Sequence, residues 1–273
     1  MITGPLQSAK VRDPLIGVGV GAFSGLMGVG GGIILMPYLL LVRKIPQKVA
    51  SATSLVLVGM GAATGAVTYA IDGHVAWIPA LCILIGGLIG AWLGAHLVQR
   101  LHDQRLQVAF GVLMVLVSIR MFIPIGGGVI AENSDLPTIT ALTTVIYAVC
   151  GIAMGMISAL FGIGGGVIMV PILVLGFGYS QQLANGTSLT VMFPIAMLGA
   201  IRLTKPGLTN WPVGLRLGVG AAIGAIGGAA FALAVPSELL RFAWAILLFI
   251  LGVRMIRHGW KKPEPQEPES LSR

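Results

Sequence analysis

Charged side chains are scarce in this chain of 273 residues, of which they make up only 10%, against about 25% in an ordinary soluble domain. The acidic residues number nine, and each lies at a segment end, in a loop or in the tail. With no carboxylate inside an apolar segment, the sequence offers no Na⁺ site or proton relay of the usual acidic kind. Carboxylate pairs, HExxH and Cys–His sets are also missing from these segments, so we expect neither an enzyme nor a cofactor.

Cysteines are few as well. Cys82 and Cys150 lie in apolar stretches and share no motif, so we expect neither a disulfide nor a metal site. The start of the chain, MITGPLQSAKVRDP, has no apolar core before a cleavage site, which predicts no cleaved signal peptide. The net charge of +8 comes from basic residues that mostly flank apolar segments. That pattern sets membrane orientation, so we expect no nucleic-acid partner, and a homo-oligomer stays open.

Apolar residues are abundant, at 56% of the chain, and the mean hydropathy is +0.95. A transmembrane helix needs about 20 consecutive apolar residues. Three runs of this kind contain no charge: Val49 to Ile71, Val75 to Ala95 and Val219 to Ser237. The sequence therefore predicts an all-α polytopic protein with the lipid bilayer as its surroundings.

An internal repeat without gaps relates the two halves. Pro37 and Pro171 lie 134 positions apart, and ATSL at 52–55 matches GTSL at 186–189 at the same offset. We expect two homologous units with four apolar segments each. The predicted organisation is an N-terminal extension (1–13), unit 1 (14–123), a linker (124–137), unit 2 (138–257) and a disordered polar tail (258–273).

The charges of matched loops predict how the units are oriented. The loop 43–48 carries three positive residues and its counterpart 177–182 carries none, whereas 202–207 carries two and its counterpart 68–73 none. Since Lys and Arg favour the cytoplasmic side, the units are predicted to be inverted repeats. Inversion needs an odd number of crossings, so the first segment of each unit is expected to be a re-entrant hairpin. Eight full spans with parallel units are the alternative.

Glycine triplets interrupt the first segment of each unit, within GVGGGIILMP (28–37) and GIGGGVIMVP (162–171). Non-helical backbone at membrane depth exposes N–H groups at the start of the next half-helix, which favours an anion. We therefore predict a substrate site at Gly30, Gly31 and Gly32 and at Gly164, Gly165 and Gly166. Close helix packing is the alternative for the triplets. For the glycines spaced every four residues, packing is the preferred interpretation.

Hydroxyl residues follow each triplet at the start of the next segment, as Thr53 and Ser54 in unit 1 and as Thr187 and Ser188 in unit 2. Such hydroxyls either cap a helix or donate to an anion, and both interpretations stay open. Asn185, in the second copy alone, is a further candidate donor.

The doubled G-[VI]-G-G-G-x-[IV]-x-x-P motif, followed by A-T-S-L or G-T-S-L, resembles the TauE/SafE sulfite exporter family, also called the toluenesulfonate uptake permease family. The resemblance covers both units. It implies a multi-pass transporter of the bacterial inner membrane for small sulfur-containing anions, such as sulfite, sulfoacetate and other organosulfonates. The positions that carry over are the two glycine triplets and the two Thr-Ser pairs. Substrate, direction and coupling ion are not implied.

We therefore expect a secondary transporter that binds its anion at mid-membrane. The alternative is a passive channel or facilitator for other small anions such as carboxylates, because carboxylates suit the same donors. A scaffold or receptor is less favoured, since packing alone does not require broken helices.

Overall fold

The computed structural model describes residues 12–100, residues 108–119 apart from 110, 113 and 117, and residues 140–260. Regular structure in these ranges is entirely helical. Among the described residues, five helices are long and apolar enough to cross a membrane: α3 (Gln47–Ile71), α4 (Trp77–Arg100), α6 (Ala141–Phe161), α8 (Gln181–Thr204) and α9 (Trp211–Ala234). The helix α10 (Ser237–Trp260) follows. The all-α polytopic prediction is confirmed, while the expected linker and the tail beyond residue 260 lie outside the described residues.

The first segment of each unit is a broken hairpin. In unit 1, α1 (Arg12–Met27) is followed by α2 (Gly32–Pro37) and the π-helix η1 (Tyr38–Val42). In unit 2, α6 is followed by α7 (Gly166–Pro171) and the π-helix η2 (Ile172–Gly176). The chain doubles back in both copies, although α6 alone is 21 residues long.

Contacts at the open end of each hairpin show this reversal. In unit 1, Arg43 Nη2 lies 2.6 Å from Asp13 Oδ1. In unit 2, the rings of Tyr147 and Phe177 stack with centroids 4.4 Å apart. We call these two ends the hairpin mouths. From Asp13 to the end of α1 the helix rises about 21 Å, which is less than the roughly 30 Å core of a bilayer. Each glycine break therefore lies at membrane depth if its mouth lies at the surface.

Positive φ angles explain why the breaks are built from glycine. Gly28, Gly30 and Gly31 have φ of 72°, 76° and 69°, and the matched glycines of unit 2 share this geometry. Only glycine adopts this left-handed region at no steric cost, so it ends one half-helix and starts the next. Pro37 and Pro171 then lack the N–H for a normal helical hydrogen bond, and a π-helix follows each of them.

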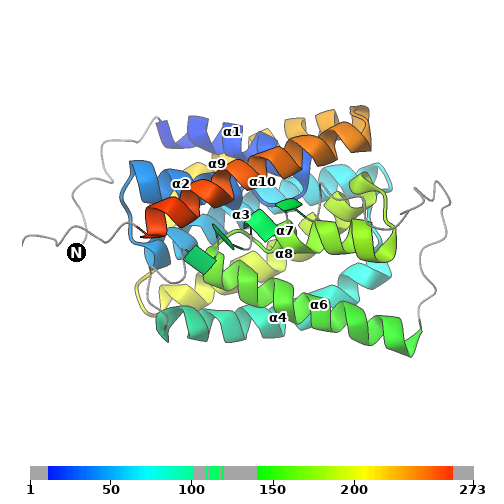
Figure 1. Cartoon of the computed structure of the whole chain (residues 1–273), viewed down its shortest axis with the longest axis horizontal. Coiled ribbons are helices and arrows are strands. Elements are labelled where there is room, and N and C mark those ends of the chain that lie inside the picture. The colour runs from blue at the N-terminus through cyan, green and yellow to red at the C-terminus, as the bar shows by residue number, and fades with distance from the viewer. Residues whose placement is uncertain are drawn as a thin grey trace, which may run out of the picture.

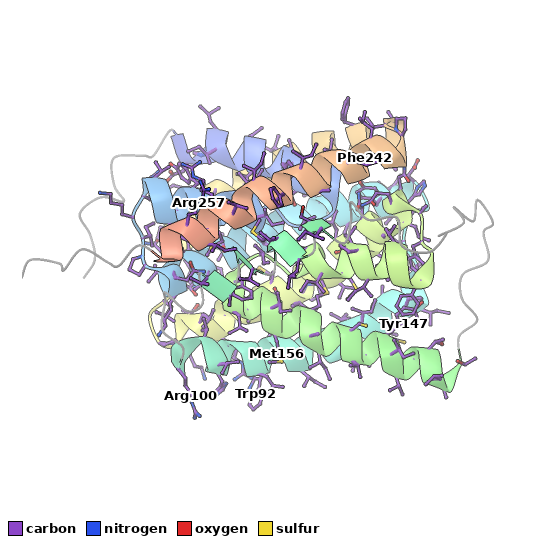
Figure 2. The ribbon with its side chains drawn as sticks, in the orientation of Figure 1. Trp92, Arg100, Tyr147, Met156, Phe242 and Arg257 are labelled. Atoms are coloured by element: carbon purple, nitrogen blue, oxygen red, sulfur yellow. The ribbon has the colours of Figure 1, made fainter. Side chains whose placement is uncertain are left out.

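Helices of different units pair along both sides of the bundle. Figure 1 shows α1 beside α9 along one edge and α4 beside α6 along the other, with α3 and α8 between them. A Cβ built on Gly21 would overlap the backbone of Ala221, and one on Gly90 would overlap that of Ile152. The packing role expected for the spaced glycines is therefore confirmed. In Figure 2, Trp92 projects outward from the α4 edge.

The equivalent helices α3 and α8 run in opposite directions. Leu55, early in α3, lies beside Gly199, late in α8. Gly65, late in α3, lies beside Leu189, early in α8. Equivalent helices that run antiparallel support the inverted arrangement that the loop charges predict. The orientation of each unit across a membrane stays a prediction.

Candidate functional site

The two glycine breaks meet at the centre of the molecule. A Cβ built on Gly32 would lie 2.5 Å from Ile163 Cα, and one on Gly166 would lie 2.8 Å from Val29 Cα. The hairpin tips are thus in direct backbone contact. All six predicted site glycines are buried there: Gly30, Gly31, Gly32, Gly164, Gly165 and Gly166.

Two apolar side chains fill the space beside the breaks. Val58 of α3 and Met192 of α8 occupy equivalent positions of the repeat and are fully buried. A Cβ on Gly30 would overlap the Met192 methyl group and lie 2.8 Å from Val58 Cγ1, and a Cβ on Gly164 would meet the same two groups. The glycines at these two positions therefore leave room for side chains of α3 and α8.

Side chains satisfy carbonyl groups at the helix ends that precede the breaks. Ser51 Oγ donates to Leu160 O at 3.1 Å, and Ser54 Oγ donates to Gly162 O at 2.6 Å. In the other copy, Asn185 Nδ2 donates to Leu26 O at 3.3 Å. The C-terminal ends of α1 and α6 are therefore capped by donors from α8 and α3.

The N–H groups of the breaks differ from these carbonyl groups in their hydrogen bonding. In the described part of the chain, the N–H groups from Val29 to Ile33 make no hydrogen bond, and neither do those from Ile163 to Val167. Both stretches are buried. Buried N–H groups without partners are rare and destabilising, and water or a ligand usually satisfies them. At each break a carbonyl at the end of the preceding helix is paired, whereas the N–H groups that follow are not, so the centre can offer donors to a ligand that accepts hydrogen bonds.

The structure places the predicted hydroxyl residues at two different locations. Ser54 and Asn185 lie at the breaks, where the carbonyl oxygens already take their donors. Thr53 Oγ1 instead accepts from the N–H of Asn210, and Thr187 Oγ1 accepts from Ala76 N at 3.0 Å. Each threonine thus caps a helix of the other unit, α9 or α4.

Ser188 is the remaining hydroxyl residue of the predicted site. Its Oγ lies 3.5 Å from Met192 Sδ, within the α8 turn that faces the breaks. Substrate binding by these hydroxyl and amide residues stays a prediction.

The two hairpin mouths differ in chemistry at matched positions. Asp13, which lies at a segment end as the sequence shows, is nevertheless only 1% exposed. The reason is that the hairpin folds Arg43 back over Asp13. Burial alone would lower the pKa of Arg43, but its hydrogen bond to Tyr38 and the charge of Asp13 outweigh this and raise that pKa. In unit 2, burial and the hydrogen bond between the hydroxyls of Tyr179 and Tyr147 raise the pKa of Tyr179 well above its ordinary value.

Sequence reasoning found Asn185 but missed Ser51, Val58 and Met192 of this centre. Ser51 and Asn185 occupy equivalent positions, but a search for identical residues does not pair them. Val58 and Met192 are likewise equivalent without being identical. Their shared offset of 134 was the available signal. No group of three or more His, Cys, Asp or Glu side chains that could hold a metal ion occurs among the described residues.

Comparison with known proteins identifies the family to which this chain belongs. The model of the sulfite exporter TauE/SafE family matches residues 3–121 and 147–273. The chain belongs to this family. TauE/SafE proteins are membrane transporters, and with its five long apolar helices this member is a multi-pass membrane protein. No solved structure gives a significant match.

Curated relatives of this TauE/SafE chain carry transporter names. One is the probable membrane transporter protein YunE of Bacillus subtilis, 27% identical over 90% of this chain and 96% of the relative. Another is a probable membrane transporter protein of Xylella fastidiosa (strain Temecula1), 30% identical over 88% of this chain and 92% of the relative. These bacterial relatives are consistent with a location in the inner membrane.

Proposed function

We propose that this chain is a secondary transporter that moves small sulfur-containing oxyanions across the inner membrane, with sulfite, sulfoacetate and other organosulfonates as the substrate class. The family name, sulfite exporter, supports the class. The proposal includes an inverted pair of units and a site at their interface, and it assigns no enzymatic step.

One observation carries the site: in the described residues the buried N–H groups from Val29 to Ile33 and from Ile163 to Val167 have no partner, whereas a carbonyl at the end of each preceding helix is paired. A sulfonate or sulfite group offers three oxygens that accept hydrogen bonds and no donor when ionised. The fully buried described side chains include no Lys or Arg, so neutral donors are the groups available to offset the ligand charge. Ligand oxygens that reach these N–H groups would complete the pairing that the fold leaves open.

The first experiment measures thermal stability of the purified protein in detergent against sulfite, thiosulfate, sulfoacetate, taurine, acetate, malonate, phosphate and chloride. A ligand at 100 times its dissociation constant stabilises the folded state by about 2.7 kcal/mol, which is a readily detected shift. We expect the sulfur anions to raise the midpoint temperature. A shift with acetate and malonate alone would discard the substrate class and favour the carboxylate alternative.

The second experiment measures sulfite counterflow in proteoliposomes. Saturable exchange of labelled for unlabelled sulfite is expected, whereas a passive channel would give conductance without counterflow. Gly30→Ala adds a methyl group between the breaks, and Gly73→Ala adds one at a glycine of the same φ, 76°, with nothing within 4 Å of the new Cβ. Counterflow should be lost in the first variant and kept in the second. Equal counterflow in both variants would argue against a site at the breaks.

A further inference from the structure

Two buried serines next to the breaks have no hydrogen-bond partner. Ser24 on α1 and Ser158 on α6 are equivalent positions of the repeat, and each is only 1% exposed. Within the described part of the chain, neither Oγ atom makes a hydrogen bond. Leaving a buried hydroxyl unpaired is unfavourable, and such groups in native proteins call for an explanation. That the same hydroxyl is unpaired in both copies makes an accidental origin implausible.

Both serines lie one helical turn before the stretch of unpaired N–H groups. The N–H of Gly28 donates to Ser24 O at 2.9 Å, and the N–H of Gly162 donates to Ser158 O at the same distance. A Cβ built on Gly31, which precedes α2, would lie 3.4 Å from Ser24 Cβ. The Ser24 side chain therefore packs against the start of the half-helix that follows the break.

The other hydroxyls at the breaks behave differently. The hydroxyls of Ser51 and Ser54 donate to Leu160 O and Gly162 O, so these two serines have a structural role in the fold. Among the described residues, Ser24 and Ser158 satisfy no other group. Their hydroxyl groups are therefore free to donate a hydrogen bond to a ligand.

We propose that Ser24 and Ser158 are substrate-binding residues, each donating its hydroxyl to an oxygen of the transported oxyanion from one repeat. This inference rests on the proposed function, since it requires that an oxyanion enters the centre. It adds two side-chain ligands to a site otherwise made of backbone N–H groups, and it places one of them on each hairpin.

The test compares binding with stability in the same variants. Ser24→Ala and Ser158→Ala remove a hydroxyl that has no hydrogen-bond partner among the described residues, and alanine is the best helix former. Each variant should therefore unfold at the wild-type temperature or above it. Sulfite affinity, measured from the concentration dependence of the thermal shift, should fall about tenfold or more, because hydrogen bonds to charged groups are the strong ones.

A matched control is Ser118→Ala. Ser118 is also a buried serine, but its Oγ already donates to Ala245 O at 2.8 Å. This variant should unfold at a lower temperature and keep the wild-type affinity for sulfite. Ser24→Cys, which keeps the side-chain shape but donates only weakly, should bind sulfite less tightly than wild type.

Each outcome is decisive. Wild-type protein that neither binds nor exchanges sulfite or any other sulfur anion overturns the proposed function and this inference together. If wild type binds sulfite and both alanine variants bind it within twofold of wild type, only the inference fails. Loss of folding or a lowered unfolding temperature in Ser24→Ala and Ser158→Ala would assign both serines a structural role and would also overturn it.

Discussion

Gly30→Ala probes the packing between the two breaks in a way that separates backbone strain from crowding. Gly30 and Gly73 share a φ of 76°, so alanine meets the same backbone penalty at both, about 1–2 kcal/mol. At Gly73 the new methyl group has nothing within 4 Å, whereas at Gly30 it would overlap the Met192 methyl and lie 2.8 Å from Val58 Cγ1. Overpacking of this kind costs about 1–3 kcal/mol. We therefore expect Gly30→Ala to lower the free energy of unfolding by about 2–5 kcal/mol.

In the Gly30→Ala background, Met192→Val should restore the part of the unfolding free energy that is lost to overpacking. It shortens the side chain that the new methyl meets and gives α8 the residue that α3 has at the equivalent position, Val58. A double-mutant cycle of Gly30→Ala and Met192→Val, measured by reversible SDS unfolding in mixed micelles, should give a coupling energy of about 1–3 kcal/mol. The cycle of Gly73→Ala with Met192→Val should give none. A coupling energy below about 0.5 kcal/mol at Gly30 would refute the placement of Met192 between the breaks.

Three further substitutions test the contacts that hold the hairpins, each through the free energy of unfolding in SDS titrations. Asp13→Asn should destabilise by about 1–3 kcal/mol, because Arg43 loses a charged partner at the mouth; unchanged stability would mean that the pair does not close the hairpin. Asn185→Ala should cost a similar amount, about 1–3 kcal/mol, by leaving Leu26 O unpaired, and a neutral result would contradict this cap. Thr187→Val should cost about 0.5–2 kcal/mol as a lost helix cap, with sulfite counterflow retained if capping is its whole role.

The helices and the hairpins followed from the sequence because their causes are local. Uncharged runs of about 20 residues can only be spanning helices, and three adjacent glycines cannot continue one. The position at which each hairpin turns was likewise visible at Gly28–Gly31 and Gly162–Gly165. The boundaries shifted by a few residues, as for α1, which begins at Arg12 rather than at residue 14.

Partners across the two units could not be predicted in the same way. That α1 packs on α9 and α4 on α6 depends on how the repeats dock, and the small-residue stripes show only that some close contact exists. The hydroxyls illustrate the same limit. The choice between capping and donation at Thr53 and Thr187 is made by Asn210 and Ala76, which belong to the opposite unit in each case.

The equivalence of the two units extends further than their identical residues. Ser51 donates to the carbonyl of Leu160, and Asn185 donates to that of Leu26, so each residue caps the hairpin of the other unit. Serine in one copy and asparagine in the other do the same task because it needs only a donor of the right reach. At the mouths, an ion pair in unit 1 and an aromatic stack in unit 2 hold the same two positions together.

The two units have different residues at these caps and mouths, where many residue types can donate a hydrogen bond or hold the two positions together. Where a positive φ and close approach admit glycine alone, the units do not differ: Gly28, Gly30 and Gly31 match Gly162, Gly164 and Gly165 without exception. The capping residues therefore need to provide only a stable fold, whereas the breaks are restricted by the backbone itself. Substitutions at caps and mouths should accordingly change stability before transport, and substitutions at Ser24 and Ser158 should change transport before stability.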